Sequence, residues 1–406
     1  MPKNIIFLHP DLGIGGAERL VVDAALALIA KGHIVNFVTT HHDLSHCFEE
    51  TKNGSFPVTV VGDWIPRNIF GKFYALCAYL KMIYAAFYII CFSQIDPDLI
   101  FCDIVSACIP VFWLCRCRVI YYCHFPDQLL SKPGSKLKSL YRAPLNWLEE
   151  KTTASADIIL VNSEFTRNVF KDTFRSIQKM PEILYPSINT EFFNRDCCSS
   201  LKEIIGVDFE SDRFIFLSIN RYERKKNILL AITALSLLKT KLSENDWNRV
   251  NLVIAGGYDN RVNENLEYYE ELKEKSIKYE VQNKVHFLKS PSDDEKLFLL
   301  QQCDCLLYTP SNEHFGIVPL EAMYSRKAVI AVNNGGPVET VVDGETGFLC
   351  EASEESFSSA MAVCVKDIHV TQNFGMAGRK RFEEKFSFSA FQNNLNEIVE
   401  KMTLSV

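Results

Sequence analysis

The sequence predicts an α/β protein of two successive doubly wound domains, each built on a parallel sheet. Short apolar runs such as residues 5–8 and 214–219 are typical of strands that are buried on both faces. Glycine-containing loops follow these runs and lead into helical periodicity, as at residues 17–31, which is the order of a βαβ unit. The alternation begins again after a turn-rich segment, and a chain of 406 residues suits two cores better than one.

The predicted elements alternate in both halves of the chain. Strands are expected at residues 5–8, 34–39, 58–61, 99–102, 119–123 and 158–162, and again at 214–219, 252–255, 285–288, 305–308 and 328–332. Helices are expected at residues 17–31 and 227–239, and a hairpin at 341–349. Ligands of such sheets bind outside the carboxyl ends of the strands, so we expect the site in a cleft between the domains.

The same pattern suggests where the domains begin and end. We expect a first domain at residues 1–190, a linker at 191–212 and a second domain at 213–385. Residues 386–406 carry four apolar side chains on one helical face, and these are Phe391, Leu395, Ile398 and Met402. This last helix is expected either to cap the second domain or to cross back to the first.

Composition excludes several classes of protein. Hydrophobic residues make up 48% of the chain and charged residues 23%, which is typical of a folded globular protein. The net charge of −7 argues against general nucleic-acid binding, which needs a basic face. The 14 cysteines lie mostly in apolar surroundings without zinc-ligand spacing, so we expect reduced thiols and a cytosolic environment. The first residues lack the pattern of a signal peptide and are expected to form a strand.

One segment indicates contact with a membrane. Residues 76–92 are apolar except for Lys81 and several tyrosines. Seventeen residues are at the short limit for a spanning helix, which needs about 20. A buried helix, a helix in the plane of the membrane and a true span all stay open. Lys81 and the tyrosines suit an interfacial position, so a membrane-associated segment at residues 73–93 is expected.

The most informative motif follows the predicted strand 305–308. Glu313 lies in a turn and Glu321 eight residues later, about one turn inside the predicted helix. The backbone N–H groups of Phe315, Gly316 and Ile317 would point from the helix N-terminus, which is a natural anion site. An anion site between two carboxylates fits a nucleotide-sugar, whereas an ordinary helix start is the alternative.

A basic loop follows the predicted strand 214–219. It contains Arg221 and the adjacent lysines Lys225 and Lys226. Cations at the carboxyl end of a strand would stabilise the negative charge that develops on a diphosphate leaving group without a metal ion. The alternative is a solvated run of charges.

Two further loops carry candidate residues in the first half. Gly15 and Gly16 lie between the first strand and its helix, where Glu18 stands in place of the third glycine of a dinucleotide-binding fingerprint. A dehydrogenase is therefore disfavoured. His124 and Asp127 follow the predicted strand 119–123, and a histidine at this edge of a sheet is a candidate for the site.

Two other loops complete the candidates. Gly335 and Gly336 lie in a turn after the predicted strand 328–332, close to the expected cleft. Residues 132–142 are basic with apolar neighbours, so they either form a solvated loop or contact anionic groups.

Four strings together resemble family 4 retaining glycosyltransferases, which have the GT-B fold of two Rossmann-like domains facing across a cleft. The strings are residues 9–20, 122–127, 220–227 and 309–323. The resemblance covers nearly the whole chain and extends in particular to the eukaryotic α-1,3/1,6-mannosyltransferases of N-linked glycan assembly. It implies GDP-mannose as the donor and Man-GlcNAc2-diphosphodolichol as the acceptor. The expected place is the endoplasmic reticulum membrane, on its cytosolic face, with other early N-glycan transferases as partners.

The resemblance also implies roles for the motif residues. Arg221 and Lys226 would hold the donor phosphates, with Lys225 as a rival, and Glu313 would contact the sugar and Glu321 the ribose. His124 would lie near the sugar. Gly15, Gly16, Gly335 and Gly336 would approach the diphosphate or the acceptor through their backbone.

A retaining reaction needs either a carboxylate nucleophile or attack from the face of the leaving group. Because the resemblance places Glu313 against the sugar hydroxyls and Glu321 on the ribose, no carboxylate of the motifs is left for the first path. We therefore expect the second path, with the leaving phosphate accepting the proton of the acceptor and with no metal or cofactor required. A different sugar-nucleotide donor, an epimerase and a silent scaffold for partner transferases are the alternatives.

Overall fold

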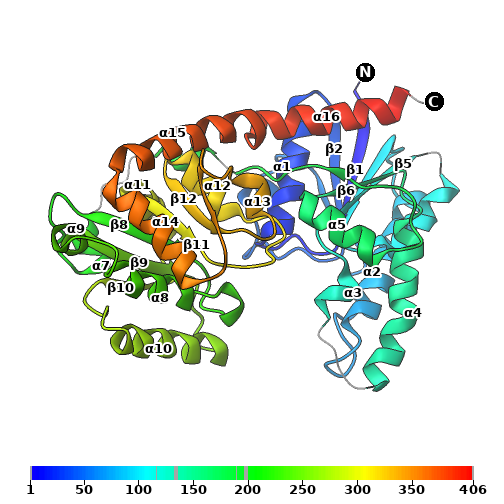
Figure 1. The fold of residues 1–406 in the computed structure, drawn as a ribbon. Coiled ribbons are helices and arrows are strands. Elements are labelled where there is room, and N and C mark those ends of the chain that lie inside the picture. The colour runs from blue at the N-terminus through cyan, green and yellow to red at the C-terminus, as the bar shows by residue number, and fades with distance from the viewer. Residues whose placement is uncertain (1, 116, 132–135, 189, 196–199, 405–406) are drawn as a thin grey trace. The chain divides into compact units, whose positions relative to one another are not determined.

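The computed structural model describes residues 2–115, 117–131, 136–188, 190–195 and 200–404. The chain forms two compact units. Unit 1 comprises Met1–Ser187 together with Phe388–Val406, and unit 2 comprises Ile188–Ser387. Each unit holds one parallel sheet covered by helices (Figure 1).

Unit 1 is built on a seven-stranded parallel sheet of order β3-β2-β1-β4-β5-β6-β7. Its strands are β1 (Asn4–His9), β2 (Ile34–Thr39), β3 (Val58–Val60), β4 (Leu99–Asp103), β5 (Arg118–Cys123), β6 (Ile158–Val161) and β7 (Glu182–Ile183). Its helices are α1 (Gly16–Ala30), α2 (Tyr74–Cys91), α3 (Asp127–Leu130), α4 (Lys136–Thr153), α5 (Glu164–Thr173) and α16 (Phe388–Leu404), with 3₁₀ segments η1 (Glu49–Thr51) and η2 (Ser106–Leu114).

Unit 2 is built on a six-stranded parallel sheet of order β10-β9-β8-β11-β12-β13. Its strands are β8 (Phe214–Ile219), β9 (Val250–Gly256), β10 (Val285–Lys289), β11 (Cys305–Tyr308), β12 (Ala328–Val332) and β13 (Gly347–Cys350). Its helices are α6 (Thr190–Phe193), α7 (Leu201–Ile205), α8 (Leu229–Leu238), α9 (Glu244–Arg249), α10 (Asn263–Lys278), α11 (Asp293–Gln302), α12 (Ile317–Tyr324), α13 (Pro337–Thr340), α14 (Glu354–Lys366) and α15 (Ile368–Lys385), with the 3₁₀ segment η3 (Arg224–Lys226).

The apolar runs of the sequence become strands because both faces of each sheet are covered. In β1, Ile5 and Phe7 pack into a core shared with α1, whereas Ile6 and Leu8 pack into a second core shared with α2. The side chains of a strand alternate between its faces, so a strand buried on both sides needs apolar residues at every position.

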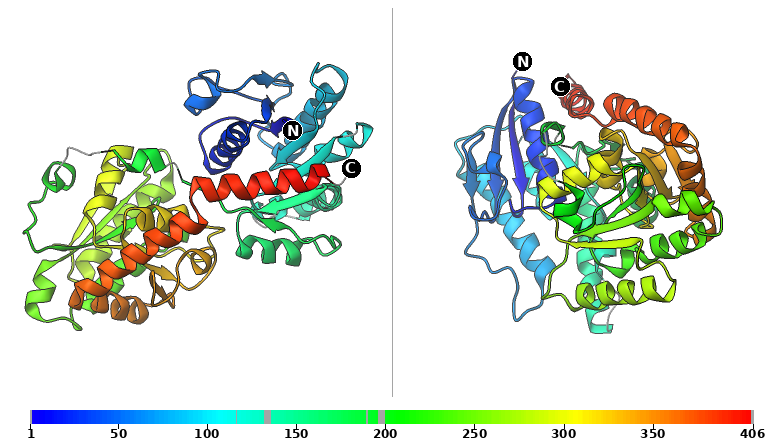
Figure 2. Two further views of the ribbon diagram at one scale, coloured as in Figure 1. Left: turned by 90° about the horizontal axis from the view of Figure 1, so that it is seen from above. Right: turned by 90° about the vertical axis from the view of Figure 1, so that its left-hand side faces the viewer.

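The C-terminal helix α16 belongs to unit 1, although the chain reaches it through unit 2. Phe391, Leu395 and Ile398 are buried in the same core as Leu20 and Val21 of α1. Figure 2 shows α16 ending near the N-terminus of the chain in both views. The apolar face of this helix therefore completes the first domain.

Helix α2 is half-buried along one side. It is long and apolar enough to cross a membrane by length and composition, with a mean hydropathy of 1.6. However, Met82, Ala85 and Ile89 lie in the core of unit 1. The opposite side exposes Tyr84 and Phe87. This two-sided packing is that of a helix lying on a folded domain.

The structure differs from the expected elements at three places. The hairpin expected at residues 341–349 was wrong: the chain turns at Gly344, and β13 then pairs in parallel with β12. Strand β7 was missed because two residues form no apolar run. The expected linker contains α6 and α7, and α7 begins with a capping box formed by Ser200 and Glu203.

Candidate functional site

The carboxyl edge of the sheet in unit 2 brings together two lysine–glutamate ion pairs. Lys226 Nζ lies 2.5 Å from Glu313 Oε1, and Lys296 Nζ lies 2.6 Å from Glu321 Oε1. Lys226 ends η3 behind β8, Glu313 lies between β11 and α12, Glu321 is in α12, and Lys296 is in α11. We call these four residues the lysine–glutamate cluster.

Local backbone features hold Lys226 and Glu313 together. Thr309, which follows β11, donates its hydroxyl hydrogen bond to the Lys226 carbonyl at 2.8 Å. Asn227 adopts a left-handed conformation with φ of 48°, which turns the chain sharply after the lysine. Gly316 has φ of 85° and caps α12, and only glycine adopts that conformation without strain. The turn therefore presents Glu313 just before the helix begins.

Glu321 is the more buried of the two glutamates. It is 7% exposed, and its Oε2 atom accepts no hydrogen bond within the described part of the chain. A buried carboxylate oxygen without a donor is costly, so it is a ready acceptor for a ligand hydroxyl. Glu313, whose side chain is 25% exposed, is also held by its lysine. Neither glutamate points freely into solvent.

A cavity of about 390 Å³ lies beside this cluster. Eleven residues line it, namely Ile219, Asn220, Arg221, Lys226, Gly256, Gly257, Ser290, Pro291, Lys296, Tyr308 and Val318. Three of them are cations, so the cavity suits an anionic ligand. Glu313 and Glu321 do not line the cavity. Each forms an ion pair with a lysine that does line it, Lys226 for Glu313 and Lys296 for Glu321.

The geometry distinguishes the two adjacent lysines. The side chain of Lys226 is 13% exposed and reaches Glu313, whereas that of Lys225 is 66% exposed and lies 3.0 Å from Glu223. Arg221 also pairs with Glu223, at 3.1 Å, and its side chain is 64% exposed. Lys226 is therefore the lysine of the cavity, and Arg221 lies at its open side.

The glycine loop before α13 packs against the backbone of the Glu313 turn. A Cβ atom on Gly336 would lie 2.1 Å from the Phe315 carbonyl oxygen, and one on Gly335 would lie 2.6 Å from the Glu313 carbonyl oxygen. The Gly336 N–H donates to the Glu313 carbonyl at 2.8 Å. These glycines support the turn from behind, and their contact with a diphosphate stays a prediction.

The N-terminus of α12 has the expected polarity. The first N–H groups of a helix have no partner within it, and these belong to Ile317 and the residues next to it. The Phe315 ring is buried 6.0 Å from the Phe386 ring and anchors the turn in unit 2. The helix therefore begins beside the cavity, where Val318 is part of the lining.

Unit 1 has a second polar cluster at the carboxyl edge of three neighbouring strands. Asp103, at the end of β4, contacts His9 Nδ1 at 2.7 Å through Oδ1 and His124 Nε2 at 3.2 Å through Oδ2. His9 and Asp103 are buried, while the His124 side chain is 23% exposed. The contact with Asp103 therefore orients the ring of His124. We call these three residues the histidine–aspartate cluster.

The electrostatics of this cluster favour an ion pair. Burial by itself lowers the pKa of His9, but the carboxylates of Asp103 and Glu18 outweigh it and raise that pKa to about 10. Burial by itself raises the pKa of Asp103, but His9 and His124 outweigh burial and lower that pKa below its usual value. His9 Nε2 lies 3.7 Å from Glu18 Oε1.

The predicted glycines of unit 1 differ in their surroundings. A Cβ atom on Gly15 would lie 2.3 Å from the Glu18 carboxylate, which folds back over the start of α1. Nothing lies within 4 Å of the same position on Gly16. Gly15 is therefore needed for the present position of Glu18, whereas Gly16 leaves open space.

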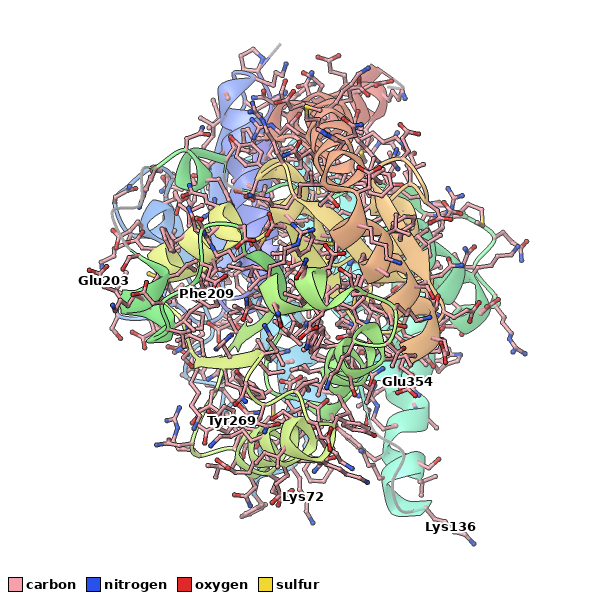
Figure 3. The ribbon with its side chains drawn as sticks, turned by 60° about the vertical axis from the view of Figure 1, so that its left-hand side comes forward. Lys72, Lys136, Glu203, Phe209, Tyr269 and Glu354 are labelled. Carbon is pink, nitrogen blue, oxygen red and sulfur yellow. The ribbon has the colours of Figure 1, made fainter. Side chains whose placement is uncertain are left out.

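Asp127 has a structural partner. Its carboxylate lies 2.8 Å from Arg142 Nη2, and its backbone N–H donates to Glu149 at 2.7 Å. Burial and the charge of Asp127 raise the pKa of Glu149 to about 7. Residues 132–135 of the basic stretch lie outside the described residues, and Lys136, at the tip of α4, projects from unit 1 (Figure 3).

Sequence reasoning missed several residues of these clusters. Lys296 is one turn into a helix with a capping box at Ser292, where a lysine looks like any surface residue. Gly256, which lines the cavity, follows the strand predicted at residues 252–255 and belongs to none of the predicted motifs, although a Cβ atom there would lie 1.7 Å from the Asn220 carbonyl oxygen. Asp103 ends an apolar run, and an acidic residue at a strand's carboxyl end was the signal that could have found it.

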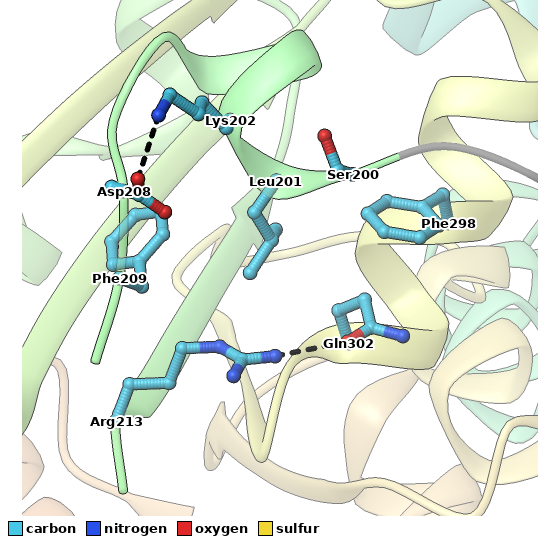
Figure 4. A pocket seen from close by; sticks show the side chains of 8 residues that line it. All are labelled: Ser200, Leu201, Lys202, Asp208, Phe209, Arg213, Phe298 and Gln302. Atoms are coloured by element: carbon cyan, nitrogen blue, oxygen red, sulfur yellow. Dashed lines mark hydrogen bonds and ion pairs between the residues drawn. The ribbon is translucent and has the colours of Figure 1, made fainter. Parts of the chain in front are cut away.

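A further pocket of about 320 Å³ lies in unit 2 between the α7 region and the end of α11 (Figure 4). Arg213 donates to Gln302 across it at 3.0 Å, and Lys202 pairs with Asp208 at 2.7 Å. Arg213 precedes β8, so this pocket is at the amino edge of the sheet, opposite the lysine–glutamate cluster.

The cysteines form no disulfides among the described residues. The 12 cysteines of the described residues are free thiols, and eight of them are buried. Within the same residues, no group of three or more His, Cys, Asp or Glu side chains is arranged to hold a metal ion.

Comparisons with known proteins give matches along nearly the whole chain. The model described as Glycosyltransferase Family 4 matches residues 14–192, and that described as Glycosyl transferases group 1 matches residues 202–381. The human α-1,3/1,6-mannosyltransferase ALG2 is 50% identical over 99% of this chain and 97% of its own length. The enzyme of the same name from Saccharomyces cerevisiae is 41% identical over 98% of this chain and 85% of its own length.

Solved structures share the fold at low sequence identity. Sucrose-phosphate synthase from Thermosynechococcus elongatus has a TM-score of 0.75 and 18% identity, and each chain is covered completely. HepE of Anabaena, in complex with UDP, has a TM-score of 0.73 and 18% identity, with 98% of this chain and 100% of that chain covered. The predicted GT-B fold of two Rossmann-like domains is thereby confirmed.

We expect the buried His9–Asp103 pair to stabilise unit 1 in a pH-dependent way. The pKa of His9 rises on folding from 6.5 to about 10, so its contribution is complete below pH 6.5 and disappears as the pH rises towards 10. Wild type and His9→Asn should be compared by urea unfolding between pH 5.5 and about 10. The stability advantage of the wild type should shrink across this range. A constant advantage would contradict an ion pair.

Proposed function

Because the chain belongs to the family of α-1,3/1,6-mannosyltransferases, we propose that it transfers mannose from GDP-mannose to Man-GlcNAc2-diphosphodolichol with retention of configuration. It is a glycosyltransferase, and the alternatives of an epimerase or a silent scaffold are set aside. In the proposed reaction one mannose enters α-1,3 linkage and another enters α-1,6 linkage.

The observation that carries the donor proposal is the convergence of two lysine–glutamate pairs beside an anion-suited cavity. In the proposed complex, Lys226 and Arg221 bind the diphosphate, and the unpaired Oε2 of Glu321 accepts a hydrogen bond from a ribose hydroxyl. Glu313 accepts hydrogen bonds from mannose hydroxyls.

Lys226 connects recognition of the sugar with recognition of the phosphate. Its ammonium has three donors, of which one serves Glu313 in this structure. The remaining donors would bind the β-phosphate and stabilise the charge that grows there as the glycosidic bond breaks. The departing phosphate oxygen would accept the proton of the attacking hydroxyl on the same face of the sugar, which retains the configuration. Lys226, Arg221 and Lys296 supply positive charge for this step, so we propose that no metal or cofactor is required.

His124 and the glycine loops of each unit are also proposed to contact substrate. His124 would lie near the mannose, with its ring oriented by Asp103. Gly15 and Gly16, at the start of α1, and Gly316, at the start of α12, would allow close approach of substrate phosphates. Gly335 and Gly336 hold the Glu313 turn in place for this contact.

We also propose that unit 1 rests on the cytosolic face of the endoplasmic reticulum membrane, where other early N-glycan transferases could act on the same lipid. The support is a set of exposed apolar side chains on and around α2, including Trp64, Phe70, Tyr84 and Phe87. Aromatic residues favour the boundary between lipid and water, and the half-buried packing of α2 favours a position in the plane of the membrane.

Product analysis tests the proposed function. The purified protein is incubated in detergent with GDP-mannose and a synthetic lipid-diphosphate trisaccharide that carries one mannose, and product linkages are determined. Products with one and then two added mannoses, in α-1,3 and α-1,6 linkage, are expected. UDP-glucose and UDP-N-acetylglucosamine are the matched donors, and transfer from either in place of GDP-mannose would refute the donor.

Variants of the lysine–glutamate cluster test the roles of its members. Glu313→Ala and Lys226→Ala should each lower kcat by about 10²-fold or more. The first change removes the carboxylate that positions the mannose and Lys226, and the second removes the ammonium that stabilises the charge on the leaving phosphate. The exposed neighbour provides a matched control, and Lys225→Ala should keep the wild-type rate to within a factor of about 3. Circular dichroism checks that all variants fold. Wild-type rates in both cluster variants would refute these roles.

A further inference from the structure

Unit 1 contains a cavity of about 550 Å³ that none of the motifs explains. It lies beyond the carboxyl ends of β1 and β2, under the first half of α2. Its lining includes Asp11, His41, Arg67, Tyr74, Ala78 and Lys81. The cavity therefore opens at the edge of the sheet where ligands of parallel sheets bind.

The most informative residue of this cavity is Lys81. The sequence suggested an interfacial lysine, but its side chain is only 6% exposed. Its ammonium has one ion-pair partner among the described residues, Asp63, at 3.6 Å. Asp63 is itself half exposed and already contacts His41 at 3.0 Å. A largely buried ammonium that is held by one long ion pair is poorly compensated, and this one lines a cavity that an anionic ligand could fill.

Other groups of the lining support an anionic ligand. Arg67 is exposed and pairs with Asp11, and His41 stands beside Asp63. Among the residues that the structure describes, each of these cations pairs with a single carboxylate. A ligand with several anionic oxygens could engage Lys81, Arg67 and His41 together, and charge-assisted hydrogen bonds of this kind are among the strongest in proteins.

The surroundings of the cavity indicate that this anion is attached to a lipid. Tyr74 and Ala78 of α2 form part of the lining. Close in sequence to the lining residues Arg67 and Asn68, Phe70 is 95% exposed and Trp64 75% exposed, and the Trp64 ring contacts Tyr84 of α2. A soluble phosphate makes no favourable contact with exposed aromatic side chains, whereas a lipid chain that covers them buries apolar surface.

We propose that this cavity binds the diphosphate of the lipid-linked acceptor, with Lys81 as the buried phosphate contact and the aromatic side chains around Phe70 contacting the first isoprenoid units. This inference rests on the proposed function, because it assigns a place to the acceptor of that reaction. It also explains why a helix that contacts lipid carries a lysine on its buried side.

Binding of farnesyl diphosphate to the full chain tests the proposal without any transfer reaction. Isothermal titration should give measurable affinity for wild type and at least a tenfold loss for Lys81→Met, which keeps the length of the side chain. Lys72→Met removes the same charge from an exposed position close in sequence (Figure 3) and should bind as the wild type does. Arg67→Gln provides a second variant of the lining and should also weaken binding.

The comparison ligands decide what the cavity recognises. Inorganic pyrophosphate and farnesol should each bind at least tenfold more weakly than farnesyl diphosphate. Equal affinity for pyrophosphate, unchanged binding by Lys81→Met, or Lys81-dependent binding to phosphatidylserine vesicles as strong as to farnesyl diphosphate would each overturn the proposal.

Kinetics separate this proposal from the proposed function. In Lys81→Met the KM for the lipid-diphosphate acceptor should rise at least tenfold, while the KM for GDP-mannose stays unchanged. An unchanged acceptor KM would overturn the acceptor site. Absence of transfer by the wild type would instead refute the proposed function, and the titration would still report on the cavity.

Discussion

The site depends on pairing buried positive and negative charges at the ends of parallel strands. Two ion pairs lie beside the cavity, Lys226 with Glu313 and Lys296 with Glu321. All four side chains are largely buried, and Glu321 is the most buried of them. A single charge in such a place would be costly, because the protein interior solvates it poorly. Each lysine is paired with a glutamate, and a ligand that brings both phosphate and hydroxyl groups can satisfy the lysine donors and the glutamate acceptors at once.

The same constraint governs unit 1. Asp103 is buried at the end of β4 and is shared by His9, the last residue of β1, and His124, which follows β5; β1 and β5 flank β4 in the sheet. Because these strands are adjacent, three residues far apart in the sequence meet at one edge. Only His124 is partly exposed, so the buried pair fixes the ring that faces outward. Lys81 is the exception. Within the described residues its only ion pair is a long one, 3.6 Å to Asp63, and Asp63 also contacts His41.

The sequence predicted the strands well, because a strand covered on both faces requires an unbroken apolar run. Residues 34–39 and 214–219 were expected as strands and form β2 and β8 with the same bounds. Strands β7 and β13 could not be found in this way. β7 has two residues, and β13 has a turn before it that suggested a hairpin.

The candidate site was predictable only in part. Glu313, Glu321 and Lys226 belong to motifs at strand ends, where position alone suggests a ligand. Lys296 belongs to no motif, and its place beside Glu321 depends on how α11 packs next to α12. The support that Gly336 gives to the Glu313 turn depends on a backbone contact across two loops, which no local pattern encodes.

The most direct test of the central claim is a crystal structure of the protein with GDP-mannose bound. The diphosphate should lie within hydrogen-bond distance of Lys226 Nζ, a ribose hydroxyl should donate to Glu321, and a mannose hydroxyl should donate to Glu313. A nucleotide bound away from these side chains, with both lysine–glutamate pairs unchanged, would contradict the account.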